Sequence, residues 1–285
     1  MVWYVLALLA AFFSASAAIF EKKVLFKENA LSFSFILAIS NFILAGSFLF
    51  FVDFSSLTYS GLGVLFFKSI LGAVAFLCVM IGIKNLEISK ALPFLVLTPG
   101  LVAFFAWVFL GEDLSFIEIG GMGLLLGGTY ILQSEKIKIK KQIESKGLKY
   151  IIVALVLFTL TSILDKALLK NFKLPVNAFM GFQHLFLALI FFVFVLFYGN
   201  IKDVRVSFKR SFWIIFFISC LTIGYRYAHI QAIKVAPVAL VLSLKRVSVF
   251  FAVLIGGKLF REKNLLVRVI ATCVMVAGAI MVVVG

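Results

Sequence analysis

Four basic residues stand inside long apolar stretches, apart from the other charges of the sequence. They are Lys68, Arg226, Lys245 and Arg246. A charge held deep in an apolar medium costs at least about 2.5–3.5 kcal/mol, so such a residue marks a candidate functional site. Arginine offers a planar fork suited to phosphate or carboxylate, and lysine adds a point charge beside it. These residue types predict a site that binds an organic anion.

The depths of these residues place them in one layer. Lys68, Arg226 and Lys245 each lie seven or eight residues from one end of their apolar stretches. At about 1.5 Å per residue this is roughly 10–12 Å below one surface. His184 lies at the same depth in its own stretch. Lys245 and Arg246 are adjacent, about 100° apart on a helix, so both cannot easily reach the lipid headgroups.

Few acidic residues are near enough to balance these cations. Asp165 is the best candidate partner, and Glu118 lies at the mouth of another apolar stretch. Positive charge is therefore left over, and a reversibly bound anion would compensate it. We expect His184 and Tyr225, which adjoins Arg226, near the rest of the ligand. Snorkelling of the cations toward the surface, and simple packing of the two rings, are the alternatives.

A second group of candidates combines prolines with small polar residues. Proline removes a helix hydrogen bond and can form a hinge or line a cavity. A small polar side chain either faces a cavity or bonds its own helix. The candidates for hinge or cavity lining are Pro93, Pro99, Ser16, Asn41, Thr161 and Gln183.

The composition decides what kind of protein must position these side chains. Of the 285 residues 64% are hydrophobic and 14% are charged, and the mean hydropathy is +1.19. Soluble domains are roughly half apolar and a quarter charged. The sequence therefore excludes a large soluble catalytic domain. The net charge of +15 comes mostly from gaps between apolar runs, where cations set membrane orientation, so we expect no nucleic-acid partner.

The apolar runs predict an all-α membrane protein with ten transmembrane helices, because lipid leaves the backbone of an open strand unsatisfied. Each run is about the length that a bilayer requires. The predicted spans are 2–20, 32–52, 60–83, 89–110, 115–133, 150–171, 177–199, 211–233, 238–260 and 264–284.

The chain divides into two similar halves. The segment 134–149 carries six lysines and separates a first repeat, 1–133, from a second, 150–285. A shift of 150 residues aligns Ile83-Lys84 with Ile233-Lys234, Glu112 with Glu262 and Gly128 with Gly278. A shift of 144 aligns Ile19, Glu21, Lys22 and Leu25 with Ile163, Asp165, Lys166 and Leu169. Five spans is an odd number, so the second repeat enters the membrane inverted, as in many secondary transporters.

The sequence resembles the EamA-type transporters of the drug/metabolite transporter superfamily. The resemblance rests on the two five-span repeats and on the fourth span, Pro99 to Phe109-Leu110-Gly111-Glu112, which leads into a glycine-rich fifth span. It implies transport of small metabolites through a cavity between the halves. The adjacent Lys245 and Arg246 also resemble the pair with which plastid sugar-phosphate translocators of this superfamily grip phosphate.

The fifth predicted span carries a GxxxG pattern at Gly123 and Gly127. Such a pattern permits close approach of two helices. Packing within the chain is one interpretation, and a homodimer contact through Gly123 and Gly127 is the other. The protein is thus expected to be a monomer or a homodimer.

The distribution of basic residues predicts the orientation. The loops that join spans 1–2, 3–4, 5–6, 7–8 and 9–10 all face one side of the membrane and hold 19 Lys and Arg. The loops on the side of the termini hold four. The positive-inside rule then puts the 134–149 segment in the cytoplasm and both termini outside. The usual arrangement of the resembled family is the opposite. The expected location is the cell (inner) membrane.

These observations predict a secondary active transporter of a small phosphorylated or carboxylated anion, working by alternating access as an exchanger or with protons. The alternative is an exporter of amino acids or of neutral or cationic metabolites and drugs. A membrane-embedded lipid-modifying enzyme or a non-transporting scaffold represents another class. The sequence shows no nucleophile motif, metal cluster or nucleotide loop, so we expect no catalytic residue, no bound metal and no cofactor.

Overall fold

The computed structural model of the chain is built from helices. It describes residues 3–86, 95, 98–111, 115–133, 146–245, 247–248, 251, 255, 259 and 265–284, and no strand occurs among them. The described helices are α1 (Trp3–Leu25), α2 (Ala30–Ala45), η1 (Gly46–Phe51), η2 (Phe54–Ser56), α3 (Tyr59–Asn85), α5 (Thr98–Leu110), α6 (Phe116–Gln133), α8 (Lys146–Lys170), α9 (Val176–Tyr198), α10 (Ile201–Val235), α11 (Val238–Lys245) and α13 (Leu265–Val284).

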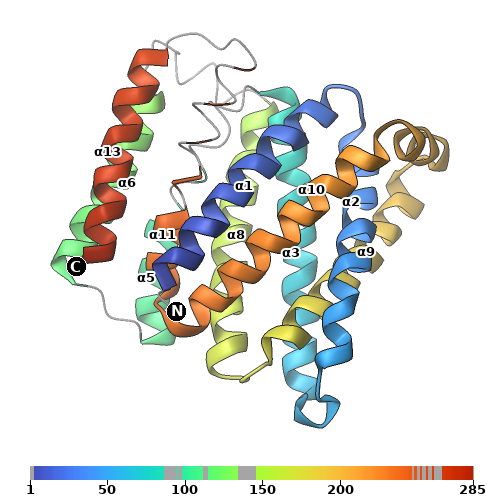
Figure 1. Cartoon of the computed structure of the whole chain (residues 1–285), viewed down its shortest axis with the longest axis horizontal. Helices are drawn as coiled ribbons and strands as arrows, with labels where there is room; N and C mark the ends of the chain where they lie inside the picture. Colours follow the sequence, from blue (N-terminus) through green and yellow to red (C-terminus); the bar gives the residue numbers. More distant parts are fainter. Residues whose placement is uncertain are drawn as a thin grey trace.

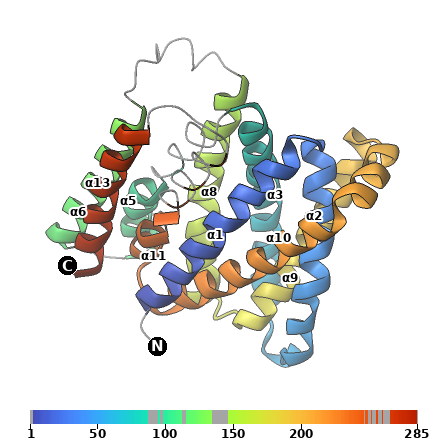
Figure 2. The same cartoon turned by 45° about the horizontal axis from the view of Figure 1, so that its top comes forward.

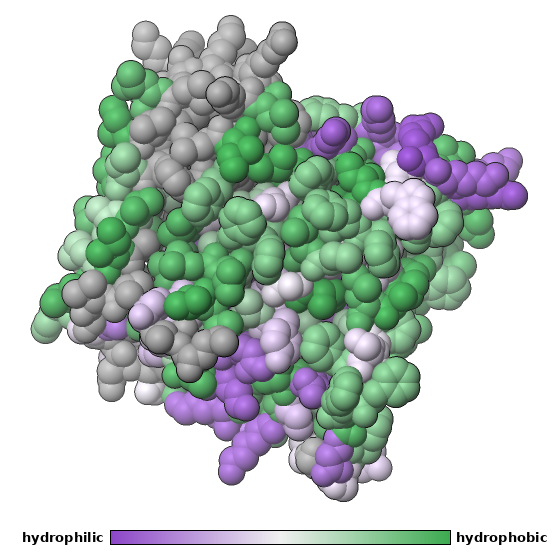
Figure 3. All heavy atoms as spheres, viewed as in Figure 1, coloured by the Kyte–Doolittle hydropathy of each residue, from purple (hydrophilic) through white to green (hydrophobic). Residues whose placement is uncertain are grey.

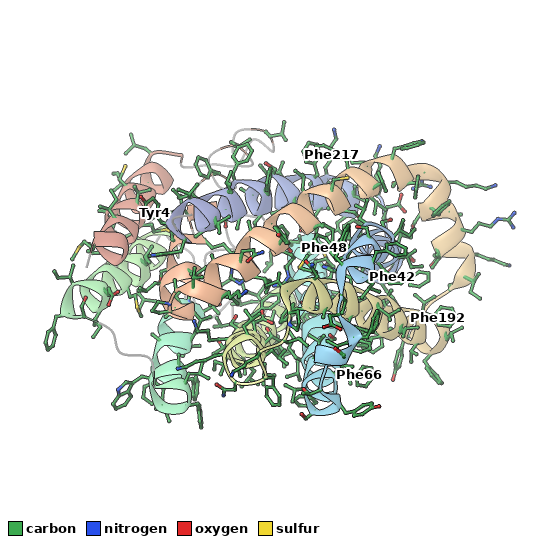
Figure 4. All side chains as sticks on the ribbon, turned by 60° about the horizontal axis from the view of Figure 1, so that its bottom comes forward. Tyr4, Phe42, Phe48, Phe66, Phe192 and Phe217 are labelled. Carbon is green, nitrogen blue, oxygen red and sulfur yellow. The ribbon has the colours of Figure 1, made fainter. Side chains whose placement is uncertain are left out.

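The helices make the chain a multi-pass integral membrane protein. Within the described residues, six helical segments are long and apolar enough to cross a bilayer: α1, α2 with η1, α3, α8, α9 and α10. The space-filling view shows a broad apolar band with hydrophilic residues gathered toward its two ends (Figure 3). Around the bundle, phenylalanines such as Phe66 on α3, Phe192 on α9 and Phe217 on α10 are exposed (Figure 4). An exposed apolar belt of this kind suits lipid rather than water.

The helices form a bundle with one pair at its edge. α6 and α13 lie side by side there, while α2 and α9 lie at the opposite edge (Figures 1 and 2). Between them α1 packs along α10, and α3 packs along α8. In the repeat predicted from sequence, α1 and α3 correspond to α8 and α10. Exchanging the halves therefore converts the α1–α10 interface into the α8–α3 interface.

Several helices begin at a side chain that accepts a hydrogen bond from the first turn. Asn29, Thr58 and Asn200 cap α2, α3 and α10 through their side-chain oxygens. At α6 a capping box forms, in which the Ser115 hydroxyl accepts from the backbone N–H of Glu118 and the Glu118 carboxylate accepts from that of Ser115. Glu118 thus caps the first turn of α6.

Two helix ends differ from the predicted spans. α10 begins at Ile201 rather than near residue 211, because Asn200 caps the charged segment that precedes the apolar run. α1 continues to Leu25 rather than ending at residue 20. Glu21 and Lys22, which had been assigned to a loop, therefore belong to the helix and are buried.

The close approach of α6 and α13 uses different glycines from those predicted. A Cβ atom at Gly123 or Gly127 would meet nothing within 4 Å. A Cβ atom at Gly278 would lie 2.5 Å from the backbone oxygen of Gly121, and one at Gly128 would lie 2.7 Å from that of Ala271. Packing within the chain thus rests on Gly128 and Gly278, which are equivalent in the repeat. The homodimer through Gly123 and Gly127 stays a prediction.

We expect Gly278→Ala to destabilise the protein, because its methyl group would collide with the backbone of α6 and force the helices apart. Overpacking of this kind costs about 1–3 kcal/mol. The measurement is the apparent melting temperature of the detergent-purified protein. Gly123→Ala is the matched control, since its Cβ has open space. Equal melting temperatures for the two variants would contradict this account of the interface.

Candidate functional site

A cavity of about 240 Å³ lies in the bundle, lined by side chains from both halves of the chain. From the first half of the chain, α1, α2 and α3 contribute residues to its wall. From the second half, α8, α9, α10 and α11 do so. The volume is just below the range of about 300–1,000 Å³ that is usual for ligand pockets. A cavity of this size suits a small metabolite.

The cavity wall contains a cluster of buried charges centred on Asp165 of α8. The Nζ atom of Lys68, on α3, lies 2.6 Å from one carboxylate oxygen of Asp165, and both side chains are buried. The guanidinium of Arg226, on α10, lies 3.7 Å from the other oxygen. Arg226 also donates a hydrogen bond of 2.8 Å to the side chain of Gln183 on α9. One carboxylate thus faces two cations, and four helices are tied together.

Lys245 enters the cavity from the end of α11. Its Nζ atom lies 4.7 Å from the centre of the Tyr225 ring, a cation–π distance. Lys68 makes a similar contact at 4.8 Å to the ring of Phe179. The aromatic faces stabilise the two ammonium groups without neutralising them. Lys68 is also paired with Asp165, and Lys245 adds a further positive charge to the cavity wall.

Several polar atoms in the wall are buried without a hydrogen-bond partner in the described part of the chain. Both ring nitrogens of His184 are in this state, as are the side-chain oxygens of Ser34, Asn41 and Thr222. Buried polar groups are nearly always satisfied by protein, water or ligand. Their convergence on one cavity makes its wall suited to bind a polar ligand.

Most of the site residues predicted from sequence meet in this cavity. Its wall includes Lys68, Arg226, Lys245, His184, Tyr225, Asn41, Thr161 and Gln183. Ser16 and Pro99 are not among the described residues that line it. The Ser16 hydroxyl donates to the backbone oxygen of Phe12, and Pro99 lies in the first turn of α5. Arg246 and Pro93 lie outside the described residues.

Glu21 is a cavity residue that the sequence analysis missed. It lies on α1, is 7% exposed and lines the cavity together with Asp165. The charged string Glu21-Lys22-Lys23 had the appearance of a loop. The available signal was the repeat, because the shift of 144 residues that aligns Lys22 with Lys166 also aligns Glu21 with Asp165. Each half thus contributes one carboxylate to the described wall of the cavity.

The two lysines that follow these carboxylates make equivalent contacts. The Lys22 Nζ atom donates to the backbone oxygens of Ile83 and Leu86 at the end of α3. The Lys166 Nζ atom donates to those of Ile233 and Ala236 at the end of α10, at 2.8 and 2.7 Å. Both lysines cap the C-terminus of a helix, where a cation is favoured by the helix dipole. The acceptors are related by the 150-residue shift.

A third buried carboxylate, Glu28, lies outside the cavity in the turn between α1 and α2. Its two oxygens accept hydrogen bonds from the hydroxyls of Ser207 and Ser211 on α10. Arg210 lies 3.9 Å away, and Lys84 donates to the backbone oxygen of Glu28 at 2.7 Å. These bonds fix the turn against α3 and α10.

The comparisons with known proteins agree with this architecture. The model of the EamA-like transporter family matches residues 1–133 and 145–284. The chain is similar to a protein of known crystal structure, with a TM-score of 0.70 at 15% identity. That similarity covers 98% of this chain and 95% of the other. At so low an identity it shows the fold alone. No curated protein matches the sequence.

Proposed function

Since the chain belongs to the EamA-like transporter family and is a membrane transporter of the drug/metabolite superfamily, we propose that it carries a small organic anion through the central cavity. The observation that carries the proposal is the charge of the wall. Among its described residues, three cations (Lys68, Arg226 and Lys245) face two carboxylates (Glu21 and Asp165), an excess of one positive charge. A phosphorylated or carboxylated metabolite would balance that excess.

In this proposal Lys245 and Arg226 hold the anionic group, together with the adjacent Arg246. Arg226 is already oriented by Gln183 and Asp165, so binding an anion requires little further ordering of its side chain. Lys68 is held mainly by Asp165 and contributes to the field at longer range. His184, Asn41 and Thr222 would bond the neutral part of the substrate.

We further propose that ten transmembrane helices form two inverted five-helix repeats, 1–133 and 150–285, joined by the basic segment 134–149. Two observations support this arrangement. The Lys22 and Lys166 caps are equivalent, and the α1–α10 and α3–α8 interfaces interchange with the halves. Inverted repeats around a shared cavity suit alternating access, in which one half rocks against the other.

The proposed membrane is the cell (inner) membrane, with both termini outside and the 134–149 segment in the cytoplasm. The charge bias of 19 against four supports this orientation. Lys22 and Lys166 are buried as helix caps, and they remove one basic residue from each side. The bias is therefore preserved.

A second candidate is export of amino acids or of cationic metabolites. It is favoured by Glu21, a buried carboxylate in the cavity wall. The family comparison makes both candidates transporters, whereas the lipid-modifying enzyme and the scaffold find no support in it.

A ligand screen by melting temperature separates the two candidates. The detergent-purified protein is heated with phosphorylated metabolites, carboxylates, amino acids or organic cations. A ligand that binds only the folded state stabilises it and so raises the melting temperature. At a ligand concentration a hundred times the Kd, the stabilisation is about 2.7 kcal/mol. We expect anions to stabilise the protein. Stabilisation by cations alone would contradict the anion proposal and support the second candidate.

A further inference from the structure

Among the residues that the structure describes, Glu21 differs from the other buried carboxylates. Asp165 faces Lys68 and Arg226, and Glu28 accepts hydrogen bonds from two serine hydroxyls. Glu21 is equally buried, but in the described part of the chain it makes no hydrogen bond and no ion pair. A buried carboxylate without a partner is costly as an ion, and uptake of a proton relieves that cost.

Glu21 shares the described wall of the cavity with other titratable groups. They come from each helix that lines the cavity with α1: Lys68 on α3, Asp165 on α8, His184 on α9, Tyr225, Arg226 and His229 on α10, and Lys245 on α11. The residues that α2 contributes to the wall do not titrate. Among the described ion pairs, Lys68 and Arg226 both face Asp165, and none involves Glu21. Glu21 is therefore the one carboxylate of the described wall whose charge is not already committed to a neighbour.

We propose that Glu21 binds the proton that accompanies the transported anion. This proposal rests on the anion-carrying function above and assigns its coupling ion. The carboxylate takes one proton and becomes a neutral acid, and no other bond changes. The positive excess of the wall then rises from one charge to two, so a bound anion is held more tightly. Proton and anion thus favour each other's binding, and by linkage the coupling is reciprocal.

The first test needs no substrate. Dicyclohexylcarbodiimide modifies protonated carboxyl groups in apolar surroundings, and mass spectrometry of peptides locates the adduct. In the wild-type protein we expect an adduct at Glu21 whose rate of formation falls as the pH rises. Asp165 and Glu28 serve as internal controls and should remain unmodified. Absence of an adduct at Glu21, or a rate that does not change with pH, would overturn the proposal.

The second test measures the coupling with sulfate as the anion. Sulfate does not change its charge over the range in which carboxyl groups and histidines titrate, so a pH effect on its binding belongs to the protein. Its apparent affinity is obtained from melting temperatures at increasing sulfate concentration. With one proton taken up per anion, we expect the wild-type affinity to rise by up to about tenfold for each unit of falling pH.

Matched variants test whether the pH dependence of sulfate affinity comes from Glu21. Glu21→Gln mimics the protonated acid and should bind sulfate at every pH as tightly as the wild type does at low pH. Glu28→Gln, which changes a buried carboxylate outside the cavity, should keep the wild-type pH dependence. A Glu21→Gln protein with the wild-type pH dependence would overturn the proposal. If sulfate stabilises none of these proteins, the anion function loses its support with this probe, and the carbodiimide result still decides whether Glu21 takes a proton.

Discussion

Replacement of Asp165 by asparagine is expected to destabilise the protein more than any other single change to the cavity. The substitution leaves Lys68, which is 2% exposed, and the neighbouring Arg226 without their shared counter-charge. Breaking a buried ion pair by removing one partner costs about 3–5 kcal/mol. For a chain of this size we expect the apparent melting temperature to fall by roughly 6–20 °C.

Two controls define the origin of this loss. Asp203→Asn removes an exposed carboxylate from the first turn of α10 and should change the melting temperature little. The double variant Lys68→Met/Asp165→Asn removes the buried charge together with its partner, and it should recover part of the loss. A single Asp165→Asn protein as stable as the wild type would show that the pair is not desolvated as the structure implies.

Lys245→Ala is expected to have the largest effect on ligand binding. Its Nζ atom is held over the Tyr225 ring and faces the cavity, so the proposed anion contacts it in a site shielded from water. Loss of one partner of a buried charge contact costs about 2–5 kcal/mol, which is a loss of roughly 30-fold to several-thousand-fold in affinity. The measurement is the concentration of the best anion that half-saturates the rise in melting temperature.

The control is Lys202→Ala, which removes an exposed cation near the start of α10. It changes the net charge equally but should leave the anion affinity unaltered. Tyr225→Phe keeps the aromatic ring and should retain most of the affinity, whereas Tyr225→Leu removes the cation–π contact. Equal affinities of the Lys245→Ala and Lys202→Ala proteins would show that the anion binds elsewhere.

Much of the architecture was predictable from sequence, because apolar runs in lipid can form only helices. The meeting of Lys68, Arg226 and Lys245 in one cavity also followed from their common depth. Arg246 lies outside the described residues, so the adjacent pair of cations stays a prediction. Glu21 was missed for a physical reason. Charged residues at the end of an apolar run normally mark a loop. Here Lys22 caps the C-terminus of α3, and α1 continues past both residues to Leu25.

The glycine contacts show the same limit of local patterns. The GxxxG pattern predicted close packing of this helix, but Gly123 and Gly127 are not the residues at which it approaches α13. The repeat had already paired Gly128 with Gly278, and these are the residues at which the backbones of α6 and α13 approach. For α6 and α13, equivalence between the two halves was a better guide to packing than the motif within one span.

The central claim is that a small anion crosses the membrane through the cavity that contains Lys245. Counterflow tests it most directly. Proteoliposomes are loaded with the anion that stabilises the protein most, and entry of the labelled anion is followed without any imposed gradient of pH or potential. We predict entry with the wild-type and Lys202→Ala proteins and its loss with Lys245→Ala. Equal entry with Lys245→Ala, or none with the wild type while a labelled amino acid or organic cation is exchanged, would contradict the claim.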